Sequence, residues 1–167
     1  GETSKTMNEN YRYRFPYLEG STFRISQGPE GSFSHHNMFA YDFAMPVGTP
    51  ICAAREGIVA LAKSDSDKGG SDRKYIEDAN FITIYHEDGT LANYYHIQHM
   101  GVTVKEGDHV RKGQVIGYSG NTGFTSGPHL HFEITKPTVS TDKKQWMAFN
   151  WELPEGNSIT MNAEEGR

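Results

Sequence analysis

Apolar and polar side chains alternate along several short stretches of this chain, and turns that contain glycine separate the stretches. Residues 80–97, NFITIYHEDGTLANYYHI, alternate on both sides of Asp88-Gly89, a pair that is typical of a tight β-hairpin. Residues 51–62 and 102–123 contain further short apolar stretches between glycine turns. No stretch has the period of an amphipathic helix. The pattern therefore predicts an all-β fold of antiparallel sheets.

The polar segments fit one domain with an insertion and two extensions. A chain of 167 residues is long enough to bury its own core. Residues 63–79, rich in Asp, Gly and Lys, are typical of an insertion between two strands rather than of a linker. We expect a single domain over residues 1–167, with its core at about residues 20–136. The ends, residues 1–15 and 136–167, are polar with scattered aromatics, and we expect them to pack on the outside.

Two histidines stand one residue apart in GPHLHFEI, residues 127–134. On a strand, His129, His131 and Glu133 share one face, and the apolar residues between them point to the other. The apolar face fits a core, so the imidazoles would line the opposite surface. A solvent-exposed strand face would give the same pattern, and partners elsewhere in the chain must decide between the two interpretations.

Candidate partners lie upstream, in residues 32–50. His35 and His36 precede Asp42, which stands between two aromatic residues where a carboxylate is costly unless its charge is compensated. A metal would compensate it. Two histidines and one carboxylate suit catalytic zinc, which keeps a fourth position open for water, better than calcium or magnesium.

The hairpin contributes His96. Strict alternation places Ala92, Tyr94 and His96 on one face, and Leu91, Asn93, Tyr95 and Ile97 on the other. Tyr94 would then either line the site or pack in the core.

Charge and cysteine content exclude several classes of protein. The net charge is -5 and Lys and Arg are scattered singly, which argues against a nucleic-acid or membrane-surface protein. No apolar run approaches the roughly 20 residues of a membrane span, so we expect no membrane insertion. Cys52 is the single cysteine and is expected to be buried rather than nucleophilic. The first residues lack the apolar region of a signal peptide, so an exported protein would have lost its signal before this sequence begins.

Three long runs over roughly residues 26–134 carry a family resemblance. They are SHHNMFAYDFAMPVGTPICAAREGIV, ITIYHEDGTLANYYHI and VKEGDHVRKGQVIGYSGNTGFTSGPHLHFEI. The chain resembles the lysostaphin-type, or LytM-like, zinc metallopeptidases, which include the β-lytic endopeptidases. The resemblance implies a LytM-like fold (a duplicated hybrid motif) whose antiparallel sheets form a groove. It also implies one zinc ion per chain and hydrolysis of peptide cross-links in bacterial peptidoglycan.

The resemblance further implies a role for each site residue. It makes His35, Asp42 and His131 the zinc ligands, and His96 and His129 the catalytic pair. Zinc lowers the pKa of bound water from ~15.7 toward ~7. The sequence has no HExxH motif, so histidine would have to assist the zinc-activated water.

The positions of the catalytic pair suggest how it would act. His129 lies ~6.5 Å from His131 along the strand and should reach the water without binding the metal. His96 would stabilise the oxyanion or protonate the leaving amine. Two roles are compatible with Glu133: it either accepts a hydrogen bond from a ring N–H or is a solvated carboxylate.

The spacing of the first ligand departs from the common family pattern. Many members place three residues between the first histidine and the aspartate, whereas six separate His35 from Asp42 here and five separate His36 from it. The loop between them must be longer. We favour His35 because the run resembles the longer-loop branch of the family, and His36 is the alternative.

Two other functions are compatible with parts of the sequence. An inactive LytM-like domain would act as a partner or activator of a cell-wall hydrolase, but such domains lose ligands that are present here. Residues 101–117 resemble turns of biotinyl and lipoyl carrier domains, but those need a lysine at a hairpin tip, and the tip here is Asp88-Gly89. We expect a monomeric endopeptidase, exported to the periplasm, cell envelope or exterior, that cuts either glycyl or D-amino-acid cross-links.

Overall fold

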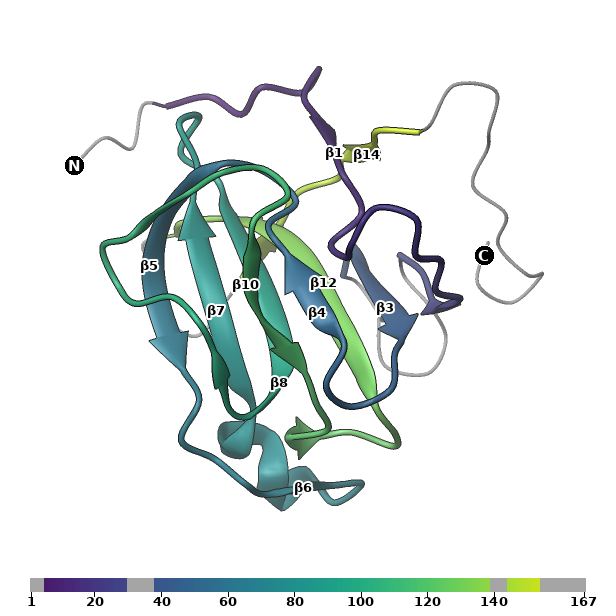
Figure 1. The fold of residues 1–167 in the computed structure, drawn as a ribbon. Coiled ribbons are helices and arrows are strands. Elements are labelled where there is room, and N and C mark those ends of the chain that lie inside the picture. Colours follow the sequence, from purple (N-terminus) through teal and green to yellow (C-terminus); the bar gives the residue numbers. More distant parts are fainter. Residues whose placement is uncertain (1–4, 30–37, 139–143, 154–167) are drawn as a thin grey trace.

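The computed structural model describes residues 5–29, 38–138 and 144–153, and β-strands form most of its regular structure (Figure 1). The main sheet has the strand order β2-β3-β12-β8-β7-β5-β9. These strands are β2 (Ile25–Gln27), β3 (Ala40–Ala44), β12 (His129–Lys136), β8 (Leu91–Val102), β7 (Asn80–Tyr85), β5 (Gly57–Lys63) and β9 (His109–Val110). All the pairings along this order are antiparallel, so the predicted fold class is confirmed.

Short strands complete the sheet and brace its ends. In Figure 1, β4 and β10 lie in front of the central strands of the main sheet. The pairings are β10 (Val115–Ser119) with β8 and with β4 (Pro50–Cys52), β13 (Gln145–Trp146) with β12, β1 (Arg12–Tyr13) with β14 (Asn150–Trp151), and β6 (Gly69–Gly70) with β11 (Gly123–Phe124). The last two pairs are parallel. A short 3-10 helix, η1 (Arg73–Asp78), follows β6.

The hairpin and the insertion both form where the sequence predicts them. Gly89 joins β7 to β8 at a φ of 87°, a conformation that favours glycine, and the Asp88 carboxylate accepts hydrogen bonds from the backbone and hydroxyl of Thr90. Residues 63–79 connect β5 to β7 and contain β6 and η1.

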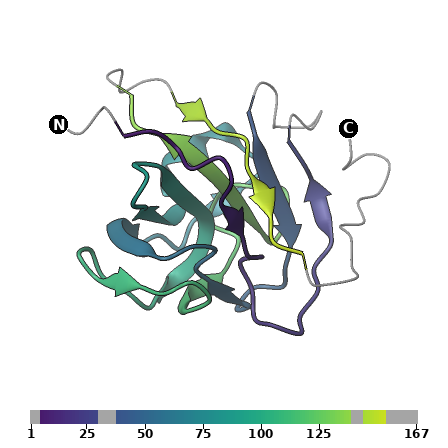
Figure 2. The ribbon, with the colours of Figure 1, turned by 90° about the horizontal axis from the view of Figure 1, so that it is seen from above.

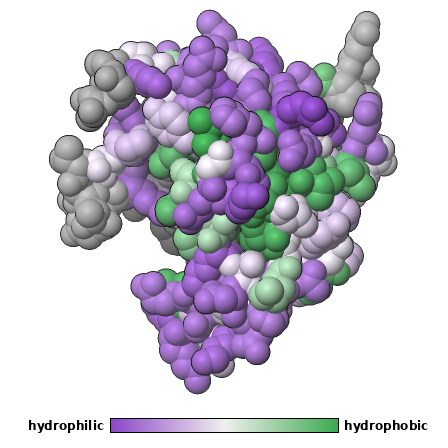
Figure 3. Space-filling model, turned by 60° about the vertical axis from the view of Figure 1, so that its left-hand side comes forward, coloured by the Kyte–Doolittle hydropathy of each residue, from purple (hydrophilic) through white to green (hydrophobic). Residues whose placement is uncertain are grey.

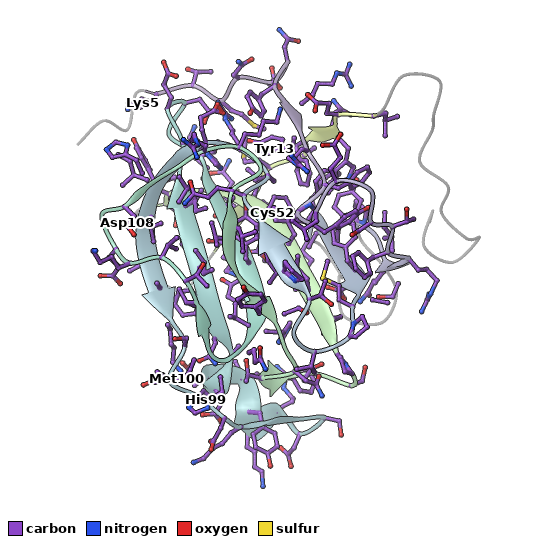
Figure 4. All side chains as sticks on the ribbon, in the orientation of Figure 1. Lys5, Tyr13, Cys52, His99, Met100 and Asp108 are labelled. Atoms are coloured by element: carbon purple, nitrogen blue, oxygen red, sulfur yellow. The ribbon has the colours of Figure 1, made fainter. Side chains whose placement is uncertain are left out.

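The core lies on the apolar face of the central strands. On β12, Leu130, Phe132 and Ile134 are completely buried, as the alternation predicts. Cys52 of β4 is buried and carries a free thiol whose pKa is raised by burial (Figure 4). The prediction of a buried cysteine is confirmed.

The aromatic residues near the chain ends correct one expectation, because they do not pack on the outside. Figure 2 shows β1 and β14 side by side, and Tyr13, Phe149 and Trp151 are at most 6% exposed. Trp151 lies at ring-centroid distances of 4.9 Å from Phe15 and 5.1 Å from Tyr41. These contacts join both ends of the described chain to the same hydrophobic cluster as the sheet.

The surface carries scattered apolar side chains. The face in Figure 3 is mostly hydrophilic, with a hydrophobic area near its middle. Met100, at the end of the sheet near η1 in Figure 4, is 72% exposed.

No helix within residues 5–29, 38–138 and 144–153 has the length and apolar character to cross a membrane.

Candidate active site

Antiparallel pairing between β3 and β12 brings together Asp42 and His131. The register places Asp42 directly opposite His131 and Ala44 opposite His129. The His131 Nδ1 atom lies 3.0 Å from Asp42 Oδ1, and His129 Nε2 lies 3.7 Å from the same oxygen. The same carboxylate oxygen of Asp42 is therefore close to both histidines of β12.

The second carboxylate on this strand face holds the other nitrogen of His131. Glu133 Oε1 lies 2.8 Å from His131 Nε2, and the Glu133 side chain is only 1% exposed. A carboxylate can only accept, so Nε2 carries a hydrogen and Nδ1 is the nitrogen that faces Asp42. Of the two roles that the sequence left open for Glu133, the structure supports that of acceptor for a ring N–H.

The two carboxylates create a strongly cation-attracting position. Burial alone would lower the pKa of His131, but hydrogen bonds to Asp42 and Glu133 outweigh it and raise the pKa to about 9. Burial alone would raise the pKa of Glu133, but His131 and Lys144 hold it at about 2. The two carboxylates therefore favour positive charge at the position of His131.

His96 reaches the site through a β-bulge, which corrects the face that alternation assigned to it. On β7, Asn80 pairs with Ile97 and Phe81 with Tyr95, so His96 is the extra residue of β8. Its φ is 71°, a left-handed conformation that is rare for a residue other than glycine. The bulge turns His96 away from the core, where Tyr94 and Ile97 are both buried, and toward the site.

The bulge also settles the two alternatives for Tyr94. Tyr94 packs in the core, where its hydroxyl accepts a hydrogen bond from Ala54 N. Tyr95 is instead the tyrosine on the site face, with its ring 5.5 Å from that of His131.

His96 and His129 form a close pair, each fixed by a backbone carbonyl. Their ring centroids are 4.4 Å apart. His96 Nδ1 lies 2.6 Å from Thr122 O, and His129 Nδ1 lies 2.8 Å from Gly127 O. Carbonyl oxygens only accept, so both Nδ1 atoms carry hydrogen, and Nε2 of each ring is the atom left for chemistry. Burial, with repulsion from His129 and His131, lowers the pKa of His96 to about 3.

The loop that supplies these carbonyls, residues 121–128, is tied to the insertion. β6 and β11 pair in parallel, with Gly123 N donating to Lys68 O and Thr125 N to Gly70 O, both at 2.9 Å. Gly69 is required because a Cβ there would collide with the carbonyl oxygen of Asn121. The insertion therefore positions the acceptors that orient the histidine pair.

The described residues fit part of a zinc site. Two ligand atoms of a tetrahedral zinc stand about 3.3 Å apart, given bonds of ~2.0–2.1 Å. The 3.0 Å between His131 Nδ1 and Asp42 Oδ1 is close to that spacing. His35, the predicted third ligand, and its alternative His36 lie outside the described residues. Within the part that is described, no group of three or more His, Cys, Asp or Glu could hold a metal.

Several residues around the site were not found from the sequence. Gln27 Nε2 donates to Asp42 Oδ2 at 3.1 Å, and Asn93 Nδ2 donates to Glu133 Oε2 at 3.1 Å. Lys144 and Trp146 also contact Glu133. Asn93 faces Glu133 only because of the strand register, which no local pattern gives. For Gln27, Lys144 and Trp146 the sequence carries no recognisable signal.

The family comparison agrees with this fold. The model of peptidase family M23 matches residues 36–145, and the chain belongs to that family. The resemblance to lysostaphin-type peptidases is confirmed.

Relatives include enzymes of the bacterial cell wall. Peptidoglycan DD-endopeptidase ShyC of Vibrio cholerae is 34% identical over 124 residues, which cover 74% of this chain and 25% of ShyC. The solved structure of the antimicrobial peptidase lysostaphin from Staphylococcus simulans is 28% identical with a TM-score of 0.60, covering 81% of this chain and 52% of that one. A zinc containing peptidase from Vibrio cholerae is 27% identical with a TM-score of 0.55, covering 74% and 36%. The chain spans 19–25% of the first curated relatives that it matches.

The left-handed backbone at His96 predicts an unusual order of stability. The free energy of unfolding of His96→Gly should be about 1 kcal/mol higher than that of His96→Ala, because a Cβ is strained at this φ. Urea unfolding with a metal chelator present measures both. The matched pair at Tyr95, whose φ is not positive, should show the reverse order. An alanine variant at His96 as stable as the glycine variant would contradict the bulge.

Proposed function

We propose that this chain is a zinc-dependent endopeptidase that hydrolyses peptide cross-links of bacterial peptidoglycan. The observation that carries the proposal is the meeting of His131 Nδ1 with Asp42 Oδ1 at 3.0 Å, beside the His96–His129 pair. Membership of peptidase family M23 and the similarity to ShyC support the substrate class. Cross-linked peptidoglycan lies outside the cytoplasm, so the enzyme would act in the periplasm, in the cell envelope or outside the cell.

Asp42 and His131 would hold one zinc ion per chain, with His35, or His36, as the third ligand. Imidazole and carboxylate donors suit zinc, and similarity to a zinc containing peptidase supports the assignment. When bound, zinc supplies Lewis acidity that lowers the pKa of water and polarises the scissile carbonyl.

The histidine pair would handle the protons of the reaction. The hydrogen bond from His129 Nδ1 to Gly127 O leaves Nε2 as a proton acceptor directed toward Asp42. His129 would accept the proton of the attacking water. His96, anchored in the same way, would donate a hydrogen bond to the oxyanion once protonated, or deliver its proton to the leaving amine.

An inactive partner domain is the less supported alternative. Such a domain would not need Asp42 and His131 in contact, nor two histidines fixed by carbonyls at 2.6 and 2.8 Å.

The first prediction of this proposal separates ligands from catalysts. The purified chain should contain about one zinc by elemental analysis, and His131→Ala should lose the metal and the activity together. His129→Ala and His96→Ala should keep the zinc and lose about 10²–10⁴-fold in turnover, the typical effect of a positioned acid or base.

The same analysis decides two open points. Of His35→Ala and His36→Ala, only one should lose zinc. If His129→Ala released zinc as completely as His131→Ala, His129 would be a metal ligand and our assignment would be wrong. His129 is the competing candidate because its Nε2 atom lies 3.7 Å from Asp42 Oδ1.

Digestion of purified muropeptides tests the substrate. Peptides with glycyl bridges and peptides with D-amino-acid cross-links are incubated separately with the zinc-loaded chain, and the products are identified by mass spectrometry. Cleavage of one type, abolished by Asp42→Ala, is expected. Zinc-loaded protein that cuts neither type would refute the proposed activity.

A further inference from the structure

Glu133 is a buried carboxylate whose two oxygens are both occupied by donors. Oε1 accepts from His131 Nε2 at 2.8 Å and from Trp146 Nε1 at 3.1 Å. Oε2 accepts from Lys144 Nζ at 2.7 Å and from Asn93 Nδ2 at 3.1 Å. A buried carboxylate is costly unless its charge is balanced and its lone pairs are used. These donors therefore decide which way Glu133 points.

Two of the four donors come from beyond the end of β12. The strand β13 pairs with β12 so that Trp146 lies opposite Thr135 and Gln145 opposite Lys136. This pairing brings the indole of Trp146 and the ammonium of Lys144 onto Glu133. The Lys144 side chain is 43% exposed and that of Glu133 is 1% exposed, so Lys144 lies between the carboxylate and solvent.

Lys144 also contacts a second neighbour of His131. Its ammonium donates to Tyr95 Oη at 2.8 Å and lies 4.6 Å from the centre of the Tyr95 ring. The Tyr95 ring is in turn 5.5 Å from that of His131, at an interplanar angle of 69°. One lysine thus contacts both the carboxylate that holds His131 and the ring that packs beside it.

We propose that Lys144 and Trp146 are positioning residues of the metal centre, because they hold the carboxylate that holds His131. This inference rests on the proposed zinc site. Lys144 supplies the balancing charge for Glu133, and Trp146 fixes the oxygen that receives His131 Nε2–H. Together they keep His131 Nδ1 directed toward Asp42. Groups that orient a metal-binding histidine in this way typically change metal affinity 10–100-fold when they are removed.

Zinc affinity of the full chain tests the assignment. The dissociation constant is measured by competition with a chromophoric chelator for wild type, Lys144→Met and Trp146→Phe. Methionine keeps the apolar stem of the lysine, and phenylalanine keeps an aromatic ring without the N–H. Each variant should bind zinc about 10-fold more weakly than wild type, the lower end of the usual range. The Tm of the metal-free protein is recorded beside each value.

Lys112→Met is the matched control for loss of a positive charge. Lys112 forms an ion pair with Glu152 at 3.2 Å and donates to the backbone carbonyl of Arg12 at 3.1 Å, so its charge is used away from Glu133. The zinc dissociation constant of this variant should equal that of wild type.

A double-mutant cycle separates positioning from general destabilisation. In a Glu133→Gln background, adding Lys144→Met should weaken zinc binding no further, because Lys144 acts through the Glu133 carboxylate. If the losses of zinc-binding free energy in Glu133→Gln and Lys144→Met simply added in the double variant, the assignment would be overturned. This holds even where the Tm of a variant has fallen.

The outcomes also distinguish this inference from the proposed function. A wild-type chain that fails to bind zinc would overturn the metal centre itself. A wild type that binds zinc, with unchanged affinity in Lys144→Met and Trp146→Phe, would overturn only the positioning role.

Discussion

Each imidazole of the site is held at one ring nitrogen by an oxygen that can only accept a hydrogen bond. The acceptors are Glu133 for His131, Thr122 for His96 and Gly127 for His129. This constraint decides which nitrogen of each ring is directed into the site. It presents Nδ1 of His131 to Asp42, and it presents Nε2 of the other two rings as proton acceptors. One set of histidines can thereby serve both as ligand and as base.

Two parts of the fold position these acceptors. One part is the sheet itself, where β3 and β8 flank β12 and bring Asp42 and Asn93 beside His131 and Glu133. The other is the loop of residues 121–128, which pairs with the insertion through β6 and β11. His131 and the histidine pair all stand on β12 or β8, but their rings are oriented by acceptors on different elements: Glu133 on β12 for His131, and the loop carbonyls for His96 and His129. Sequence changes in the insertion can therefore alter the loop while the ligands keep their strand geometry.

The sequence predicts the strand features of this protein well and its irregular features poorly. Alternation on β12 correctly separates His129, His131 and Glu133 from the core, and the cost of a carboxylate between aromatics correctly singles out Asp42 as a residue with a compensating partner. The direction of His96 could not be predicted, because one bulged residue inverts the alternation and leaves no local signal. The buried Trp151 and the contacts of Lys144 depend on pairing between distant segments, which periodicity does not reveal.

The central claim is the tautomer assigned to each histidine, and ¹⁵N NMR of the zinc-loaded, histidine-labelled chain measures it directly. Long-range ¹H–¹⁵N correlation spectra distinguish Nδ1–H from Nε2–H in every neutral ring. We predict hydrogen on Nε2 of His131, with zinc on Nδ1, and hydrogen on Nδ1 of both His96 and His129. A zinc-loaded His131 with hydrogen on Nδ1, or a His129 with hydrogen on Nε2, would contradict the account.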